Sequence, residues 1–103
     1  MVSMIYSTTG SEEEAHEIAR ELVTKKIVAC VNVIPKISSI YRWQGKIEED
    51  SESLLIAKTT EKNVEQAIAM IKLLHSYEVP DIVVLPVISG LKEYLDYVVR
   101  ETQ

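Results

Sequence analysis

Hydrophobic and polar positions along this chain predict a strand, a helix and a strand, and then the same order again. Residues 2–8 are rich in Val, Ile, Tyr and Thr, which indicates a first strand. Ser11 and Glu14 have the spacing of a capping box, so we expect a helix to begin there. The apolar residues that follow recur on one helical face: Ala15, Ile18, Ala19, Leu22 and Val23.

An almost continuous apolar run at residues 27–34 predicts a strand that is buried on both faces. Pro35 predicts a break or bend at its end. Further along, residues 54–57 predict a third strand, and Thr60 is suited to cap a second helix. The apolar face of that helix is expected to be formed by Val64, Ala67, Ile68 and Ile71.

Residues 82–88 predict a fourth strand, and Pro86 within it indicates an edge position or a bulge. A short terminal helix is predicted by the spacing of Leu91, Tyr94, Leu95, Val98 and Val99. Two right-handed crossovers side by side give a four-stranded antiparallel sheet with two helices on one face. The predicted fold is therefore α+β, a ferredoxin-like split βαβ sandwich with an extra terminal helix.

The segment 41–47 joins the two halves and predicts a protruding hairpin. Tyr41, Trp43 and Ile47 alternate with polar residues, and Gly45 can adopt the positive φ of a tight turn. This pattern predicts a hairpin with one apolar side. The other sheet face would stay open although its strands are apolar, so self-association is expected to cover it. We expect Tyr41, Trp43 and Ile47 to pack on a neighbouring subunit.

Composition narrows the classes of function. One hundred and three residues predict a single domain spanning 1–103. A net charge of −5 argues against nucleic-acid binding, and one cysteine, Cys30, excludes an intrachain disulfide. No signal peptide and no apolar run long enough to span a membrane is recognisable, so no membrane association is expected. The cytoplasm is the expected compartment.

Two histidines are candidates for chemistry. His16 lies on a polar stretch of the first helix, and we interpret it as a solvated residue. His75 lies where the second helix ends, so it either bonds the last helical carbonyls or acts as a ligand or acid–base group. Asp81 follows Pro80 and faces either His75 or solvent. His75 and Asp81 are the candidate metal ligands.

Three further residues are candidates for a ligand cleft. Cys30 and Asn32 share one strand face, where they are either a small core residue and a satisfied amide or the lining of a cleft between subunits. Lys58 at the end of the third strand is either solvated or able to bind an anion. With His75 and Tyr77, these residues form the predicted ligand cleft.

Recognised motifs of metal binding and catalysis are missing. The acidic runs 12–14 and 48–52 lack the spacing of a calcium loop, and no pair of Cys or His has ligand spacing. The chain has neither a phosphate-binding loop nor a nucleophile motif. We therefore expect a protein that is not an enzyme.

Several short motifs together resemble the CutA family of divalent-cation tolerance proteins. They occur in the family's order and spacing: Ala29-Cys30-Val31-Asn32, Tyr41-x-Trp43-x-Gly45-x-Ile47, Lys58-Thr59 and His75-x-Tyr77-x-x-Pro80. The resemblance implies a ferredoxin-like fold in a tight homotrimer and a link to copper and other divalent cations. Ser7, Ser76 and Tyr97 differ from residues that are frequent in the family.

These observations leave three hypotheses. The first is a cytoplasmic homotrimer that binds a divalent metal ion, copper above others, in metal tolerance. The second is a trimeric small-molecule or signalling module with clefts between subunits, by analogy with trimers of the PII type. The third is a scaffold that binds a protein partner.

Overall fold

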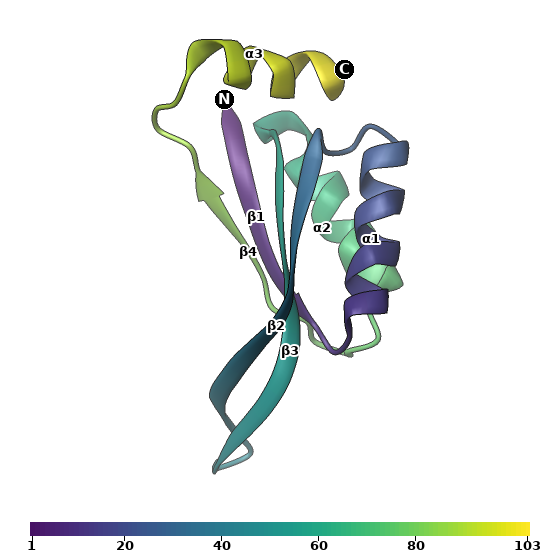
Figure 1. Cartoon of the computed structure of the whole chain (residues 1–103), viewed down its shortest axis with the longest axis vertical. Coiled ribbons are helices and arrows are strands. Elements are labelled where there is room, and N and C mark those ends of the chain that lie inside the picture. Colours follow the sequence, from purple (N-terminus) through teal and green to yellow (C-terminus); the bar gives the residue numbers. More distant parts are fainter.

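The computed structural model describes residues 1–103, and its elements follow the predicted order (Figure 1). They are β1 (Val2–Thr9), α1 (Glu12–Thr24), β2 (Cys30–Trp43), β3 (Lys46–Thr60), a 3₁₀ turn (Glu61–Asn63), α2 (Val64–Leu74), β4 (Ile82–Pro86) and α3 (Lys92–Glu101). The sheet order is β2-β3-β1-β4 with every pair antiparallel, which confirms the ferredoxin-like α+β class. None of the helices is long and apolar enough to cross a membrane.

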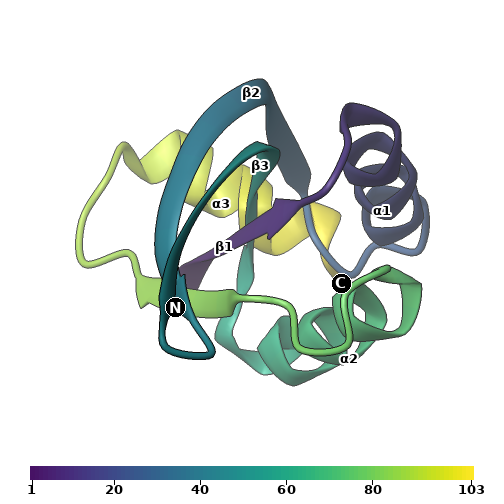
Figure 2. The ribbon, with the colours of Figure 1, turned by 90° about the horizontal axis from the view of Figure 1, so that it is seen from below.

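One face of the sheet is covered by α1 and α2, which lie side by side (Figure 2). Ile5 on β1 pairs with Ala57 on β3, and both side chains are fully buried against the helices. The capping prediction for α1 is confirmed, because the Ser11 hydroxyl accepts a hydrogen bond from the Glu14 amide at 3.2 Å. The rest of the core comes from Ala15, Ile18, Leu22, Ile27, Val28, Leu55, Ala67 and Ile71.

The opposite face of the sheet is open except at one end. There α3 crosses the strand ends, on the side of the molecule away from the hairpin tip (Figure 1). Val98 of α3 is buried against Val2 and Ala29, which form a second, smaller core. Because side chains alternate along a strand, the residues between the core positions of β1 and β3 point to this open face.

The β2–β3 hairpin extends beyond the body of the molecule (Figure 1). Trp43 pairs with Lys46, so the turn consists of Gln44 and Gly45, whose φ angles of 49° and 79° are those of the tight two-residue turn that matches strand twist. The bend expected at Pro35 is confirmed as a register shift between Ile34 and Ile37.

The prediction that Ile47 shares an apolar side with Tyr41 and Trp43 is wrong. Ile47 pairs with Arg42, and Tyr41 pairs with Glu48. Directly opposite residues of an antiparallel pair lie on one face, so a two-residue turn puts Ile47 on the face opposite to Trp43. Each face of the hairpin therefore carries apolar side chains. Tyr41 and Trp43 lie on one face, and Ile40 and Ile47 lie on the other.

The prediction of a strand over 27–34 is wrong at its start and in its burial. The strand begins at Cys30, because the amides of Ile27 and Val28 bond the Leu22 carbonyl, at 3.0 and 3.3 Å, and end α1. The side chain of Ile34 is 41% exposed and Asn32 is exposed, because the helices cover only one face of the sheet. The strand is therefore buried on one side only.

Three other boundaries differ from the sequence prediction. The third strand begins at Lys46 rather than at residue 54, because its pairing with β2 continues to the turn. The fourth ends at Pro86 rather than at residue 88, and its edge position is confirmed because β4 pairs only with β1. Thr60 makes no side-chain cap, and a 3₁₀ turn separates it from α2.

Replacing Leu22 by Ala should lower the free energy of unfolding by about 2–5 kcal/mol, because it leaves a cavity in the core under α1. Leu73→Ala is the matched control, since the Leu73 side chain is 77% exposed and that of Leu22 is fully buried. The control should change stability by less than about 0.5 kcal/mol. Urea unfolding at one fixed protein concentration measures both variants, and equal losses would contradict this assignment of the core.

Candidate functional site

The residues predicted to line a cleft fall into two groups in the structure. The first group lies on the open face of the sheet, close to α3. Cys30 and Lys58 are opposite each other in the β2–β3 pair, and Asn32 is the next residue of β2 on that face. The Lys58 ammonium donates to the Asn32 amide oxygen at 2.7 Å, so these residues form one polar cluster on the sheet.

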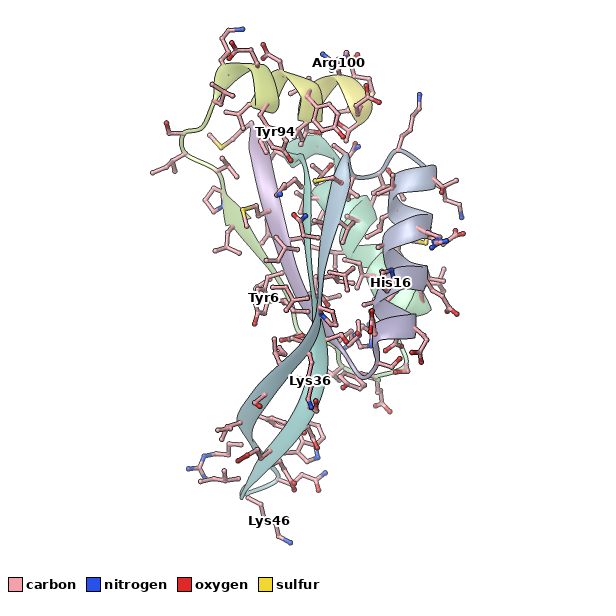
Figure 3. The ribbon with its side chains drawn as sticks, viewed as in Figure 1. Tyr6, His16, Lys36, Lys46, Tyr94 and Arg100 are labelled. Atoms are coloured by element: carbon pink, nitrogen blue, oxygen red, sulfur yellow. The ribbon has the colours of Figure 1, made fainter.

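Tyr94 of α3 completes this cluster, although the sequence pattern predicted it only as part of a helical stripe. Figure 3 shows Tyr94 between α3 and the ends of the strands. Its hydroxyl lies 3.3 Å from the Cys30 sulfur, and the Lys58 Nζ lies 5.7 Å from its ring centre. The only sequence signal was a tyrosine within an apolar helical stripe, where its hydroxyl needs a partner.

The hydrogen bond with Cys30, together with burial, raises the pKa of Tyr94 to about 12. The phenol therefore stays neutral at physiological pH and keeps its proton. The hydroxyl has one proton, so it can donate to an acceptor that enters from the open face when it gives up its bond to Cys30.

The second group surrounds Thr8, near the end of β1 that leads into α1. The His75 Nε2 lies 2.7 Å from the Thr8 carbonyl oxygen, and the Tyr77 amide donates to the His75 Nδ1 at 3.0 Å. Because Nδ1 accepts this hydrogen bond, the Nε2–H group is the donor to the Thr8 carbonyl oxygen. Both ring nitrogens of His75 therefore have a backbone partner.

Asp81 binds the same threonine from the other side. Its Oδ1 accepts from the Thr8 amide at 3.0 Å and from the Thr8 hydroxyl at 2.7 Å. Asp81 therefore faces Thr8, and it has no hydrogen bond with His75. Since both bonds use Oδ1, Oδ2 of this exposed residue is free to accept a ligand.

Glu14 closes this corner from α1. Its carboxylate accepts from the Ser76 amide at 2.6 Å and from the Gly10 amide at 3.2 Å. Burial acts to raise the pKa of Glu14, but the hydrogen bonds from Ser76 and Gly10 outweigh it and hold the pKa below its ordinary value.

Tyr77 extends the Thr8 corner toward the hairpin. Its hydroxyl donates to the Glu52 carboxylate at 2.7 Å, and burial together with this bond raises its pKa. The sequence pattern predicted only a helix-capping role for Glu14 and no role for Glu52, because their partners in this corner lie 62 and 25 residues away along the chain.

One chain does not bring the two groups together. Along β3, the residue opposite Met4 is Lys58 and the residue opposite Thr8 is Leu54. This separation of four residues corresponds to roughly 13 Å along the strand. No group of three or more His, Cys, Asp or Glu side chains is placed to hold a metal ion. The groups can share a cleft only if a second subunit contributes to it.

The remaining predicted residues lie apart from both groups. His16 is half exposed on α1 and lies 3.4 Å from the Glu12 carboxylate. In the hairpin, the side chains of Trp43 and Ile47 are 56% and 71% exposed. Tyr41 donates to Asp50 across the strands, and that bond raises its pKa to about 12.

These features define the class of protein: a ferredoxin-like α+β chain with an open apolar sheet face, a protruding hairpin and two polar clusters. The family model described as CutA1 divalent ion tolerance protein matches residues 3–101. The chain therefore belongs to the CutA1 divalent ion tolerance family, which confirms the resemblance seen in its motifs.

Curated relatives and solved structures agree with this assignment. The divalent-cation tolerance protein CutA of Thermus thermophilus is 45% identical, over 99% of each chain. Mouse Protein CutA is also 45% identical over 99% of this chain, which spans 58% of that longer protein. The solved Thermus thermophilus structure has a TM-score of 0.97 over the whole of both chains. The Archaeoglobus fulgidus structure, described as a periplasmic divalent cation tolerance protein, has a TM-score of 0.97 at 40% identity, over the whole of both chains.

The lowered pKa of Glu14 predicts a pH-dependent contribution to stability. A carboxyl whose pKa is lower in the folded state stabilises the fold above its unfolded pKa, and this contribution is lost as the pH falls through the folded value. We expect Glu14→Gln to lower the urea midpoint at pH 7, with a difference from the wild type that shrinks below about pH 4.5. Glu13→Gln on the same turn is the control, and a difference for Glu14→Gln that stays constant to pH 3 would contradict the prediction.

Proposed function

We propose that this chain is a homotrimeric divalent-cation tolerance protein that binds divalent metal ions, copper above others, and that it is not an enzyme. The observation that carries the proposal is the match of the CutA1 divalent ion tolerance model over residues 3–101. The names of its relatives support a role in metal tolerance. The chemistry of the candidate ligands supports the proposal of metal binding. The exposed apolar surface supports the proposal of a trimer.

The metal part rests on His75 and Asp81. Both hold Thr8, so their side chains converge on one corner of the fold. Imidazole and carboxylate are ligands that copper accepts. Asp81 offers its free Oδ2, whereas His75 must exchange one of its two hydrogen bonds for the metal. Two ligands from one chain are too few for a tight site, so we propose that a neighbouring subunit completes it.

The trimer part rests on exposed apolar side chains. Val83 and Leu85 on the open face are 52% and 47% exposed, and Trp43 in the hairpin is 56% exposed. Burying the rest of the Trp43 side chain would contribute roughly 3 kcal/mol per subunit. A long exposed edge and hairpin of this kind favour pairing with further copies of the chain.

A second candidate function is a trimeric small-molecule or signalling module. The observation that favours it is Lys58, a half-buried cation of the open face whose partners are all neutral. A scaffold that binds a protein partner remains a third hypothesis. The cytoplasm is the proposed compartment, although relatives carry names that include periplasmic and chloroplastic.

Copper titration of the intact protein tests the metal proposal. Isothermal titration with Cu²⁺ should give saturable binding, and His75→Ala should weaken it at least roughly tenfold, because a ligand is lost. His16→Ala is the matched control and should bind as the wild type does.

Because His75 also supports the fold, His75→Gln is a second variant that can keep the bond to Thr8. The proposed site is wrong if the wild type shows no saturable binding, or if folded His75→Gln binds copper as tightly as the wild type.

The molar mass of the protein in solution tests the proposed trimer. Light scattering on dilute protein should give about three times 11.7 kDa. Trp43→Ala should dissociate at higher protein concentration than the wild type, because it loses apolar area that we expect to be buried between subunits. Lys46→Ala at the hairpin tip is the control. A wild-type monomer, or a Trp43→Ala variant as resistant to dilution as the wild type, would count against the proposed interface.

A further inference from the structure

The open sheet face contains a cavity under the start of α3. Its volume is about 430 Å³, a size within the range of small-molecule sites. Its walls are mostly apolar and come from β1, from the segment after β4 and from α3: Met4, Val87, Leu91 and Leu95. Lys58 and Tyr94 also line the cavity, and both belong to the polar cluster of the open face, so the cavity adjoins that cluster.

Lys58 carries a charge that nothing in the chain balances. None of the four ion pairs involves this residue, and its partners are the Asn32 amide oxygen and the face of the Tyr94 ring. The Lys58 side chain is partly buried, but its bond to Asn32 is exposed, so a ligand can reach the ammonium group. An ammonium group has three donors, and only one is used here. The remaining donors suit an anionic oxygen.

The surroundings of Lys58 restrict the kind of anion. No arginine lines the cavity, so the paired donors that suit a phosphate group are missing. One ammonium group matches a single negative charge, and the Tyr94 hydroxyl can donate a further hydrogen bond when it exchanges its bond with Cys30. The apolar walls match a ligand whose body excludes water. A divalent cation would be repelled by Lys58, so the cavity is distinct from the corner formed by His75 and Asp81.

We propose that this cavity binds a small monocarboxylate with a compact apolar body. The carboxylate lies between Lys58 and the Tyr94 hydroxyl, and the body lies against Met4, Leu91 and Leu95. The inference rests on the second candidate function, ligand binding, and names the class of its ligand; it is independent of metal binding.

Benzoate and benzamide are suitable probes, because they have the same shape and differ in charge. Isothermal titration of the intact protein should show saturable benzoate binding, with benzamide at least roughly tenfold weaker. Acetate should also bind more weakly, since it lacks the apolar body. Lys58→Met keeps the length of the side chain without its charge and should weaken benzoate at least roughly tenfold. Lys62→Met is the matched control and should bind as the wild type does.

Cys30 gives an independent readout, because it is the only cysteine and lies beside Tyr94. Saturating benzoate should slow alkylation of Cys30 by iodoacetamide in the wild type and should not slow it in Lys58→Met. This effect separates binding in the cavity from binding elsewhere on the surface.

Three results would overturn the inference: no saturable benzoate binding, equal affinity for benzoate and benzamide, or wild-type affinity in folded Lys58→Met. If Lys58→Met instead lowers the mass of the assembly and benzoate has no effect, a carboxylate of a second copy occupies the site and the inference is wrong. A thermal-shift screen of nucleotides and small organic anions tests the wider proposal. Shifts with nucleotides but not with benzoate would reject the inference alone, and no shift with any compound would reject ligand binding as a function.

Discussion

The rest of the structure depends on the alternation of side chains along β1 and β3. Ile5 and Ala57 point toward α1 and α2 and are fully buried there, so their neighbours in each strand must point the other way. The chain has only α3 for that second face, and α3 covers one end of it. The polar cluster around Lys58 and the exposed apolar edge both follow from this unequal covering.

The same unequal covering explains why the two polar clusters differ in character. The corner around Thr8 is closed by His75, Asp81 and Glu14, whose bonds satisfy backbone groups where β1 ends. Groups used in this way support the fold first and serve any ligand second. The cluster at Lys58 instead holds a charge with neutral partners beside an apolar cavity. Its hydrogen bonds join side chains and satisfy no backbone group, so the cluster is also a candidate for a role in binding.

The sequence pattern was a good guide wherever contacts are local. Four features follow from near neighbours in the chain: the apolar stripe of α1, the cap that Ser11 forms with the Glu14 amide, the turn at Gly45 and the bend at Pro35. The order of the elements then restricted the topology to the ferredoxin-like arrangement, because crossovers are right-handed. The pattern failed where strand pairing decides the structure. The face on which Ile47 lies is set by its pairing with Arg42, and β2 begins at Cys30 because pairing with β3 starts there.

The sequence therefore determined which residues are candidates for binding. The tertiary structure determined which of these residues lie together in one site. The spacing of the motifs identified candidate binding residues: Cys30, Asn32, Lys58 and His75. The chemistry of each side chain defined what it could bind. Only the packed fold separated them along β1 and brought Tyr94 to Cys30, 64 residues away in the chain. Such contacts depend on the register of the strands and the placement of α3. Both are set by the burial of apolar surface over the whole molecule, which no single segment of the sequence encodes.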